Sequence, residues 1–262
     1  MGVLPWVWWY GVRRHTAYPL GSATEAVTNT VFGFMRAYVL IALWQARPSL
    51  GGYDEIDAVT FCFITQALIG PVQIFGGMDL TERIRNGDVA IDLHRPAGLQ
   101  GWWLADDLGR AAGSLLLRAG PPLLAGALVF PFRPPAPAHL AAFAAALVLA
   151  VTVSFGLRYL VAMGMFWLHD DRGLSAVTLV MSLFFSGMIL PLVVFPGALG
   201  DVARALPWAA MIQVPADVFL GRYDGAGLLG ALAFQAAWAA VLLGAGALVT
   251  RAARRKLVVH GG

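Results

Sequence analysis

Long apolar runs alternate with short polar or proline- and glycine-rich connections along the chain. A run of roughly 20 apolar residues is long enough for a helix to cross the hydrocarbon core of a bilayer. The pattern therefore predicts an all-α polytopic membrane protein with six transmembrane helices, at approximately residues 26–44, 58–75, 109–130, 140–168, 174–195 and 227–250. Gly70-Pro71 predicts a kink in the second helix, and Pro121-Pro122 interrupts the third.

The N-terminal segment, residues 1–22, carries its aromatic residues before its basic ones. It reads PWVWWYGVRR from Pro5 to Arg14, with no small-residue cleavage site after a hydrophobic core, so it does not fit a cleavable signal peptide. Aromatic rings favour headgroup depth and cations favour anionic lipid, which predicts an amphipathic helix in the membrane interface. A frayed aromatic anchor is the alternative.

Residues 79–96, DLTERIRNGDVAIDLHRP, form a charged segment between two apolar runs. Four acidic residues and three arginines are interleaved there with apolar side chains such as Leu80, Ile84 and Val89. Such a segment is too polar to lie in lipid. We expect a surface element that faces a partner outside the membrane, and a solvated loop of incidental charge is the alternative.

Residues 196–225 are too polar and too often interrupted by proline to span the membrane, yet too apolar for a free loop. Backbone groups at membrane depth need internal hydrogen bonds. We therefore expect short re-entrant helices that dip into the outer leaflet and bury Leu206, Trp208, Met211, Val218 and Phe219. A folded extracellular cap is the alternative.

Composition and charge add the orientation. Of the 262 residues, 59% are hydrophobic and only 13% are charged, against about a quarter charged in soluble domains, so we expect a single transmembrane domain over residues 1–262. Basic residues gather on the cytoplasmic side of membrane proteins, and this rule accounts for the positive net charge better than nucleic-acid binding does. With the N-terminus inside, ten basic residues (Arg13, Arg14, Arg83, Arg85, Arg95, Arg172, Arg251, Arg254, Arg255, Lys256) are cytoplasmic and four (Arg47, Arg133, Arg204, Arg222) are outside. Both termini are then expected in the cytoplasm, and the membrane is expected to be a bacterial cytoplasmic membrane.

Polar residues inside the predicted spans are candidates for a transport pathway. Arg36, Arg118 and Arg158 are the deepest charges, and Gln66 is a neutral counterpart. Ionisable groups in lipid are costly and usually face a protein interior or a wet cavity. On a cavity wall they favour anionic or polar substrates, and pairing with a neighbouring helix is the alternative.

Two other functional classes need comparison. The aspartate pairs Asp106-Asp107 and Asp170-Asp171 could hold magnesium in a membrane transferase, but neither has the additional acidic residue that such enzymes place three or four residues later. A proton-coupled secondary transporter needs a carboxylate in mid-membrane, and the carboxylates here are expected at span ends or in loops. The histidines show no metal-ligand spacing, so no metal site and no catalytic residue is predicted.

The arrangement as a whole resembles the permease subunits of type-2 ABC exporters. The resemblance covers nearly the whole chain and rests on RIRNGDVAIDLHRP, on the polar run 105–110 and on the series of prolines from Leu190-Pro191 to Val214-Pro215 and Gly221. It implies that residues 79–96 dock into a cytosolic ATPase, with Glu82, Arg83, Arg85, Gly87, Asp88 and Arg95 as coupling residues. Many relatives of the wider class carry a longer run of glutamates here. The partners it implies are two ATPase subunits and a second permease half, identical or paralogous.

This chain lacks the motif for its own ATP chemistry. A P-loop ends in Gly-Lys-Ser/Thr, whereas Lys256, the sole lysine, is followed by Leu257. Any ATP and Mg²⁺ are therefore expected on the partner ATPases, with no cofactor in this chain. The sequence leaves the substrate open among drugs, lipid-linked glycans, peptides and other amphiphiles.

Overall fold

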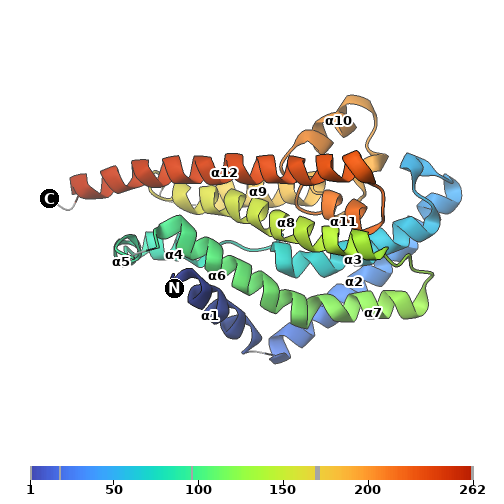
Figure 1. The fold of residues 1–262 in the computed structure, drawn as a ribbon, viewed down its shortest axis with the longest axis horizontal. Helices are drawn as coiled ribbons and strands as arrows, with labels where there is room; N and C mark the ends of the chain where they lie inside the picture. Colours follow the sequence, from blue (N-terminus) through green and yellow to red (C-terminus); the bar gives the residue numbers. More distant parts are fainter. Residues whose placement is uncertain (1, 18, 96, 169–171, 261–262) are drawn as a thin grey trace.

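The computed structural model describes residues 2–17, 19–95, 97–168 and 172–260, and all regular structure over these residues is helical (Figure 1). In these residues five helical stretches are long and apolar enough to cross a membrane: Gly21–Ala46, Glu55–Val72, Leu99–Val129, Pro137–Gly164 and Gly225–Arg255. The prediction of an all-α polytopic membrane protein is confirmed. Pro96 and the Asp170-Asp171 pair lie outside the described residues.

The long helices extend beyond most of the predicted spans. They are α2 (Pro19–Ala46), α3 (Glu55–Val72), α6 (Leu99–Ser114), α7 (Gly120–Val129), α8 (Pro137–Gly164) and α12 (Gly225–His260). The third span begins ten residues earlier than predicted (109 − 99), because the polar turn around Asp106 continues the helix instead of preceding it. The basic tail after residue 250 likewise continues α12.

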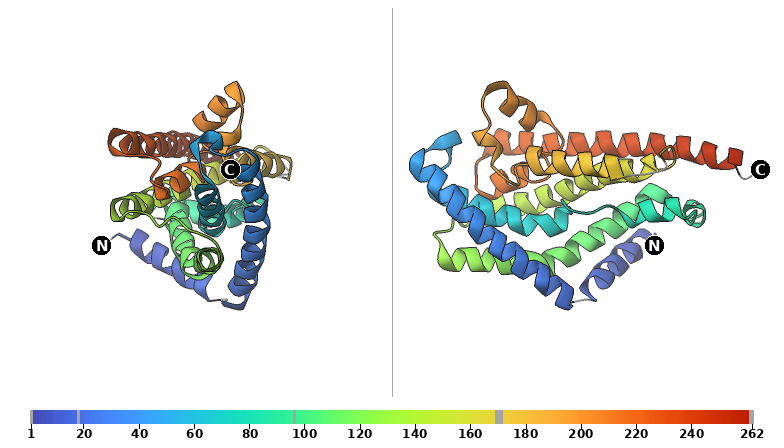
Figure 2. Two further views of the ribbon diagram at one scale, coloured as in Figure 1. Left: turned by 90° about the vertical axis from the view of Figure 1, so that its right-hand side faces the viewer. Right: turned by 180° about the vertical axis from the view of Figure 1, so that it is seen from behind.

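Helix α3 is the central helix of the bundle. In its apolar stretch of 18 residues, 78% of the residues are buried, against 22% in the corresponding stretches of α2 and α12. Burial on all sides is expected for a helix that is enclosed by others. Phe61, Phe63 and Ile64 are almost completely buried. The end-on view in Figure 2 shows α3 in the middle of the bundle. Gly126 of α7 and Gly33 of α2 let the Phe63 ring approach, since a Cβ at either position would contact it.

Both ends of α3 are fixed by local sequence. Asp54 and Asp57 form a capping box at its start, with the Asp57 amide donating to Asp54 Oδ1 at 2.7 Å. Pro71 was predicted to kink the helix, but the helix ends at Val72, and Gln73 adopts the left-handed conformation with φ 54°. A non-helical connection therefore follows α3 and leads to the charged segment, which begins at Asp79.

A π-helical turn, η2 (Leu115–Ala119), joins α6 to α7 immediately before Pro121-Pro122. Proline has no amide hydrogen, so the carbonyls of the preceding turn lose their usual donors, and a wider turn accommodates this loss. The predicted interruption is thus a local widening within one continuous 31-residue helix.

The predicted span 174–195 is wrong in its second half. Helix α9 (Arg172–Phe185) has 14 residues, about 21 Å, which is shorter than the hydrocarbon core. Gly187 then has φ +85° and lies against Gln213, and a short 3-10 turn, η3 (Leu192–Val194), follows Pro191. A sixth crossing stays a prediction.

The expected short helices between residues 196 and 225 are present. Helix α10 (Gly197–Ala205) is largely exposed, whereas every residue of α11 (Gln213–Phe219) is buried between α8 and α3. Met211, Val218 and Phe219 are buried as predicted, while Leu206 and Trp208 are half-buried.

The two ends of the bundle are formed by different elements. Helices α1 (Leu4–Thr16), α4 (Asp79–Arg85) and α5 (Val89–Leu93) lie at the end where α12 finishes, together with Arg83 and Arg254 (Figure 1). A further 3-10 turn, η1 (Leu50–Gly52), the 130–136 loop and α10 lie at the other end, together with Arg47 and Arg133. We call these the α1 end and the α10 end.

Candidate functional site

The charged segment folds into two short helices joined by a glycine turn. Helix α4 ends at Arg85, where the Asn86 amide donates to the Glu82 carbonyl at 2.9 Å. Gly87 follows with φ +83°, a conformation that glycine adopts without strain. Gly87 therefore follows the end of α4 and reverses the chain into α5.

The apolar side chains of this helix pair attach it to the transmembrane bundle. Leu80 and Val89 are 0% and 2% exposed and belong to a cluster with Trp103 of α6 and Tyr159 and Met163 of α8. Burying one such side chain contributes about 1.5–3 kcal/mol. The helix pair is therefore fixed to α6 and α8.

A buried carboxylate holds the two short helices together. Asp92 of α5 is fully buried; Arg83 Nε lies 2.6 Å from its Oδ2, and Arg95 Nη2 lies 2.7 Å from its Oδ1. The hydrogen bond with Asp92 is the main cause that raises the pKa of Arg83. Arg95 also stacks on Trp102 at 4.1 Å.

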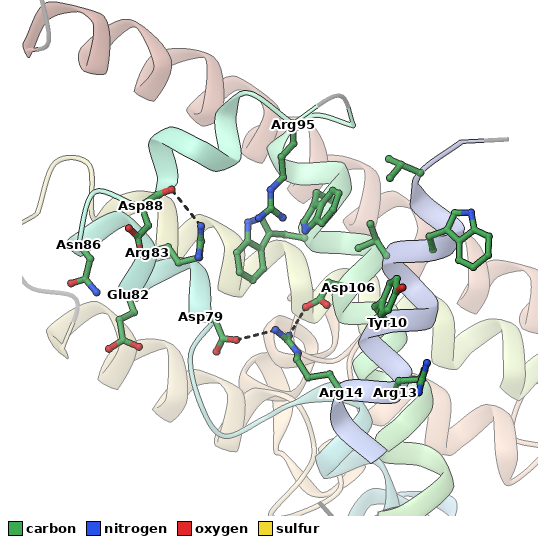
Figure 3. Close-up of a pocket in the computed structure, with 15 residues that line it drawn as sticks. Tyr10, Arg13, Arg14, Asp79, Glu82, Arg83, Asn86, Asp88, Arg95 and Asp106 are labelled. Atoms are coloured by element: carbon green, nitrogen blue, oxygen red, sulfur yellow. Dashed lines mark hydrogen bonds and ion pairs between the residues drawn. The ribbon is translucent and has the colours of Figure 1, made fainter. Parts of the chain in front are cut away.

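The six predicted coupling residues therefore fall into two groups. Arg83 and Arg95 hold the segment together, while Glu82, Arg85, Gly87 and Asp88 are exposed. Figure 3 shows Glu82 on the side of α4 away from α1. The structure thus offers the second group to a partner, and the coupling role of all six residues stays a prediction.

An open cleft of about 880 Å³ lies between α1, α4, α5 and α6 (Figure 3). Arg14 of α1 bridges its walls, with Nη2 2.8 Å from Asp106 Oδ2 and Nη1 3.7 Å from Asp79 Oδ2. Trp102 and Trp103 form part of the lining, which also includes four acidic residues and four arginines. The cleft carries no clear preference for one sign of charge.

Helix α1 packs closely against α6 at positions where one of the two helices has a glycine. A Cβ at Gly109 would collide with the Trp8 carbonyl, and one at Gly11 would lie 2.6 Å from the Asp106 carbonyl. Gly109 and Gly113 are separated by three residues, the spacing that permits close helix contact. Sequence reasoning missed this contact, although the spacing could have indicated it.

A buried ion network lies behind the cleft. Asp107 of α6 pairs with Arg158 of α8 at 2.7 Å and with Arg110 at 2.8 Å. Arg110 also donates to the carbonyls of Gly70 and Pro71, both at 2.9 Å. Asp107 lies within α6, which begins at Leu99, and not in the loop before it.

The four pathway candidates do not line one common cavity. Arg158 is held by Asp107 and borders a 260 Å³ cavity between α8 and α9. Arg36 Nη1 donates to Thr65 Oγ1 at 3.2 Å, while its Nε and Nη2 and the Gln66 Oε1 atom are buried without a hydrogen-bond partner among the described residues. Arg118 lines a separate cleft on the other side of the bundle and pairs with Glu25 at 2.6 Å.

A second polar cluster, missed from the sequence, lies near the α10 end. Asp217 of α11 accepts hydrogen bonds from Tyr53 and from Gln213 Nε2, the latter at 3.0 Å. Burial raises the pKa of Asp217 to about 6, although these bonds and Arg222 act against the shift. The cluster joins α11 to the loop before α3.

The described residues contain no group of three or more His, Cys, Asp or Glu side chains placed to hold a metal.

Comparison with known proteins adds evidence on the chain as a whole. A model of the family described as ABC-2 family transporter protein matches residues 30–261, which is most of the chain. No curated protein matches the chain. No solved structure matches it either.

Proposed function

The chain belongs to the ABC-2 transporter family and is a permease component of an ABC transporter, and from this premise we propose that it serves an ATP-driven exporter of an amphipathic substrate. Members of the family associate with ABC ATPase subunits. We propose that two such ATPases bind at the α1 end and that a second permease half, identical or paralogous, completes the pathway.

The attachment of the charged helix pair is the observation that carries the proposal. Leu80 and Val89 are buried against α6 and α8, while Glu82, Arg85 and Asp88 are exposed at the tip. An ATPase that binds the exposed side chains and moves the helix pair would therefore also move α6 and α8. Charges of both signs suit a polar interface whose register is set by complementarity.

The basic residues support the orientation. More arginines lie at the α1 end (Arg13, Arg14, Arg83, Arg85, Arg95, Arg251, Arg254 and Arg255) than at the α10 end (Arg47, Arg133, Arg204 and Arg222). The positive-inside rule therefore favours a bacterial cytoplasmic membrane with both termini in the cytoplasm. Labelling of a cysteine placed at Glu82 tests this orientation, because membrane-impermeant reagent added to intact cells should leave it unmodified.

The structure favours neither the proton-coupled secondary transporter nor the magnesium-dependent transferase. Asp107 is a buried carboxylate, as a proton-coupled carrier requires, but Arg158 and Arg110 both neutralise it. Asp106 points to Arg14 and not to Asp107, so the pair does not form a joint magnesium site. Purification of the tagged chain in mild detergent should recover an ABC ATPase; a stable complex without one would contradict the proposal.

A further inference from the structure

A second cleft, of about 510 Å³, opens between α2, the end of α3 and the α6–η2 junction. It lies among the membrane-spanning helices toward the α1 end, since His15 of α1 borders it. Arg118 and Ser114 of the continuous α6–η2 helix and Asn29 of α2 line it. Wide π-helical turns such as η2 are frequent at functional sites.

Ser114 is a buried polar residue that borders this cleft. Its side chain is 4% exposed, and its hydroxyl has no hydrogen-bond partner among the described residues. Leaving a buried hydroxyl unsatisfied is costly, and such a group needs an explanation. Gly70 makes room for this hydroxyl, because a Cβ at that position would collide with Ser114 Oγ.

Arg118 has donor capacity left over. Its Nη1 pairs with Glu25 at 2.6 Å, and its Nε donates to Ser22 Oγ at 3.4 Å. Its Nη2 makes no hydrogen bond with the described residues. Arg110 adds a second positive charge to the lining, but its donors are occupied by Asp107, Gly70 and Pro71. The lining therefore carries two guanidinium groups and one carboxylate.

The surface around the cleft is apolar. Phe75 lines the cleft and is 49% exposed, and Phe32, one helical turn after the lining residue Thr28 on α2, is 55% exposed. In a membrane protein such side chains suit contact with acyl chains. A polar group held in the cleft could thus carry an acyl chain that lies along this surface.

We propose that this cleft binds the phosphate group of a membrane amphiphile, with Arg118, Ser114 and Asn29 as donors. An ionised phosphate accepts several hydrogen bonds from different directions, and its pairing with arginine is charge-assisted. The assignment of that amphiphile as the exported substrate rests on the proposed function. A free phosphate ion shares the headgroup chemistry but would not use the apolar surface.

Photolabelling of the purified protein in phosphatidylcholine nanodiscs tests the site. A photoactivatable phosphatidic acid should label peptides around residues 32 and 75, and a diacylglycerol probe with the same acyl chains should not. Arg118→Gln should reduce the labelling about tenfold, and Ser114→Ala should also reduce it. Arg204→Gln, at the α10 end, serves as the matched control and should leave it unchanged.

The double variant Arg118→Gln/Glu25→Gln removes the ion pair without changing the net charge of the cleft. It should lose labelling as Arg118→Gln does. Wild-type labelling of the double variant, equal labelling by diacylglycerol, or displacement of the lipid probe by inorganic phosphate at the same concentration would overturn the proposal.

The assay needs no ATPase, so its failure leaves the proposed function standing. Conversely, a chain that is labelled as expected but binds no ATPase refutes the proposed function alone. In an assembled complex, labelling that falls during ATP turnover supports an exported headgroup. Labelling that persists through turnover would overturn the assignment of the amphiphile as substrate.

Discussion

Arg158 of α8 and Asp107 of α6 form a buried ion pair, with Arg158 Nη2 2.7 Å from Asp107 Oδ2 across a sequence separation of 51 residues. Their side chains are 8% and 6% exposed. Arg110 shares the carboxylate and caps the end of α3 through the Gly70 and Pro71 carbonyls. Asp107 and its two arginines therefore connect α6, α8 and the end of α3.

Replacing this carboxylate should destabilise the bundle. Asp107→Asn leaves two arginines without their buried counter-charge, for which we expect a loss of about 3–5 kcal/mol. Asp106→Asn is the matched control one residue away. Its partner Arg14 is half exposed, so the expected loss is below about 1 kcal/mol. Thermal unfolding in detergent compares the two, and equal shifts would contradict the role of Asp107.

The contact between α1 and α6 predicts a glycine effect. Gly109→Ala places a methyl group against the Trp8 carbonyl, and overpacking of this kind costs about 1–3 kcal/mol. Hydrogen exchange over residues 4–16 should therefore become faster. Gly101→Ala on the same helix meets nothing within 4 Å and should leave this exchange unchanged. Unchanged exchange in both variants would show that α1 is not held by this contact.

The spans were predictable because crossing a bilayer imposes a length that one apolar run can satisfy. The shortened α9 was not, since it depends on Gly187 lying against Gln213, a contact between segments far apart in sequence. Arg83 and Arg95 looked like outward-facing charges because nothing in the sequence marks Asp92 as buried. Pairing with a neighbouring helix was the alternative for Arg158, but the sequence could not name Asp107 as its partner, because the two residues lie 51 positions apart.

The two groups within the charged segment should respond differently to substitution. Arg83→Ala removes the bidentate partner of buried Asp92, and we expect the α4–α5 pair to lose about 2 kcal/mol of local stability. Glu82→Ala removes an exposed side chain and should have little effect. Hydrogen exchange over residues 79–95 measures both. Faster exchange in Glu82→Ala than in Arg83→Ala would contradict this division.

The cluster at Asp217 predicts a pH effect on stability. Burial raises the folded-state pKa of Asp217 from 3.8 to about 6. The folded protein thus holds this proton to a higher pH than the unfolded chain does, so its contribution to stability falls as the pH rises through that window, by up to about 3 kcal/mol. Asp217→Asn removes this dependence. Thermal unfolding should show the variant gaining on the wild type as pH rises, and a constant difference would refute it.

ATP hydrolysis by the assembled complex in proteoliposomes tests the central claim, that the exposed tip of residues 79–96 couples the permease to its ATPases. Glu82→Lys reverses a charge at the tip, and Asp201→Lys makes the same change on α10 at the opposite end. Substrate-stimulated hydrolysis should fall several-fold in Glu82→Lys and stay at the wild-type rate in Asp201→Lys, with both proteins present in the membrane at equal amounts. Equal stimulation in both variants would contradict the claim.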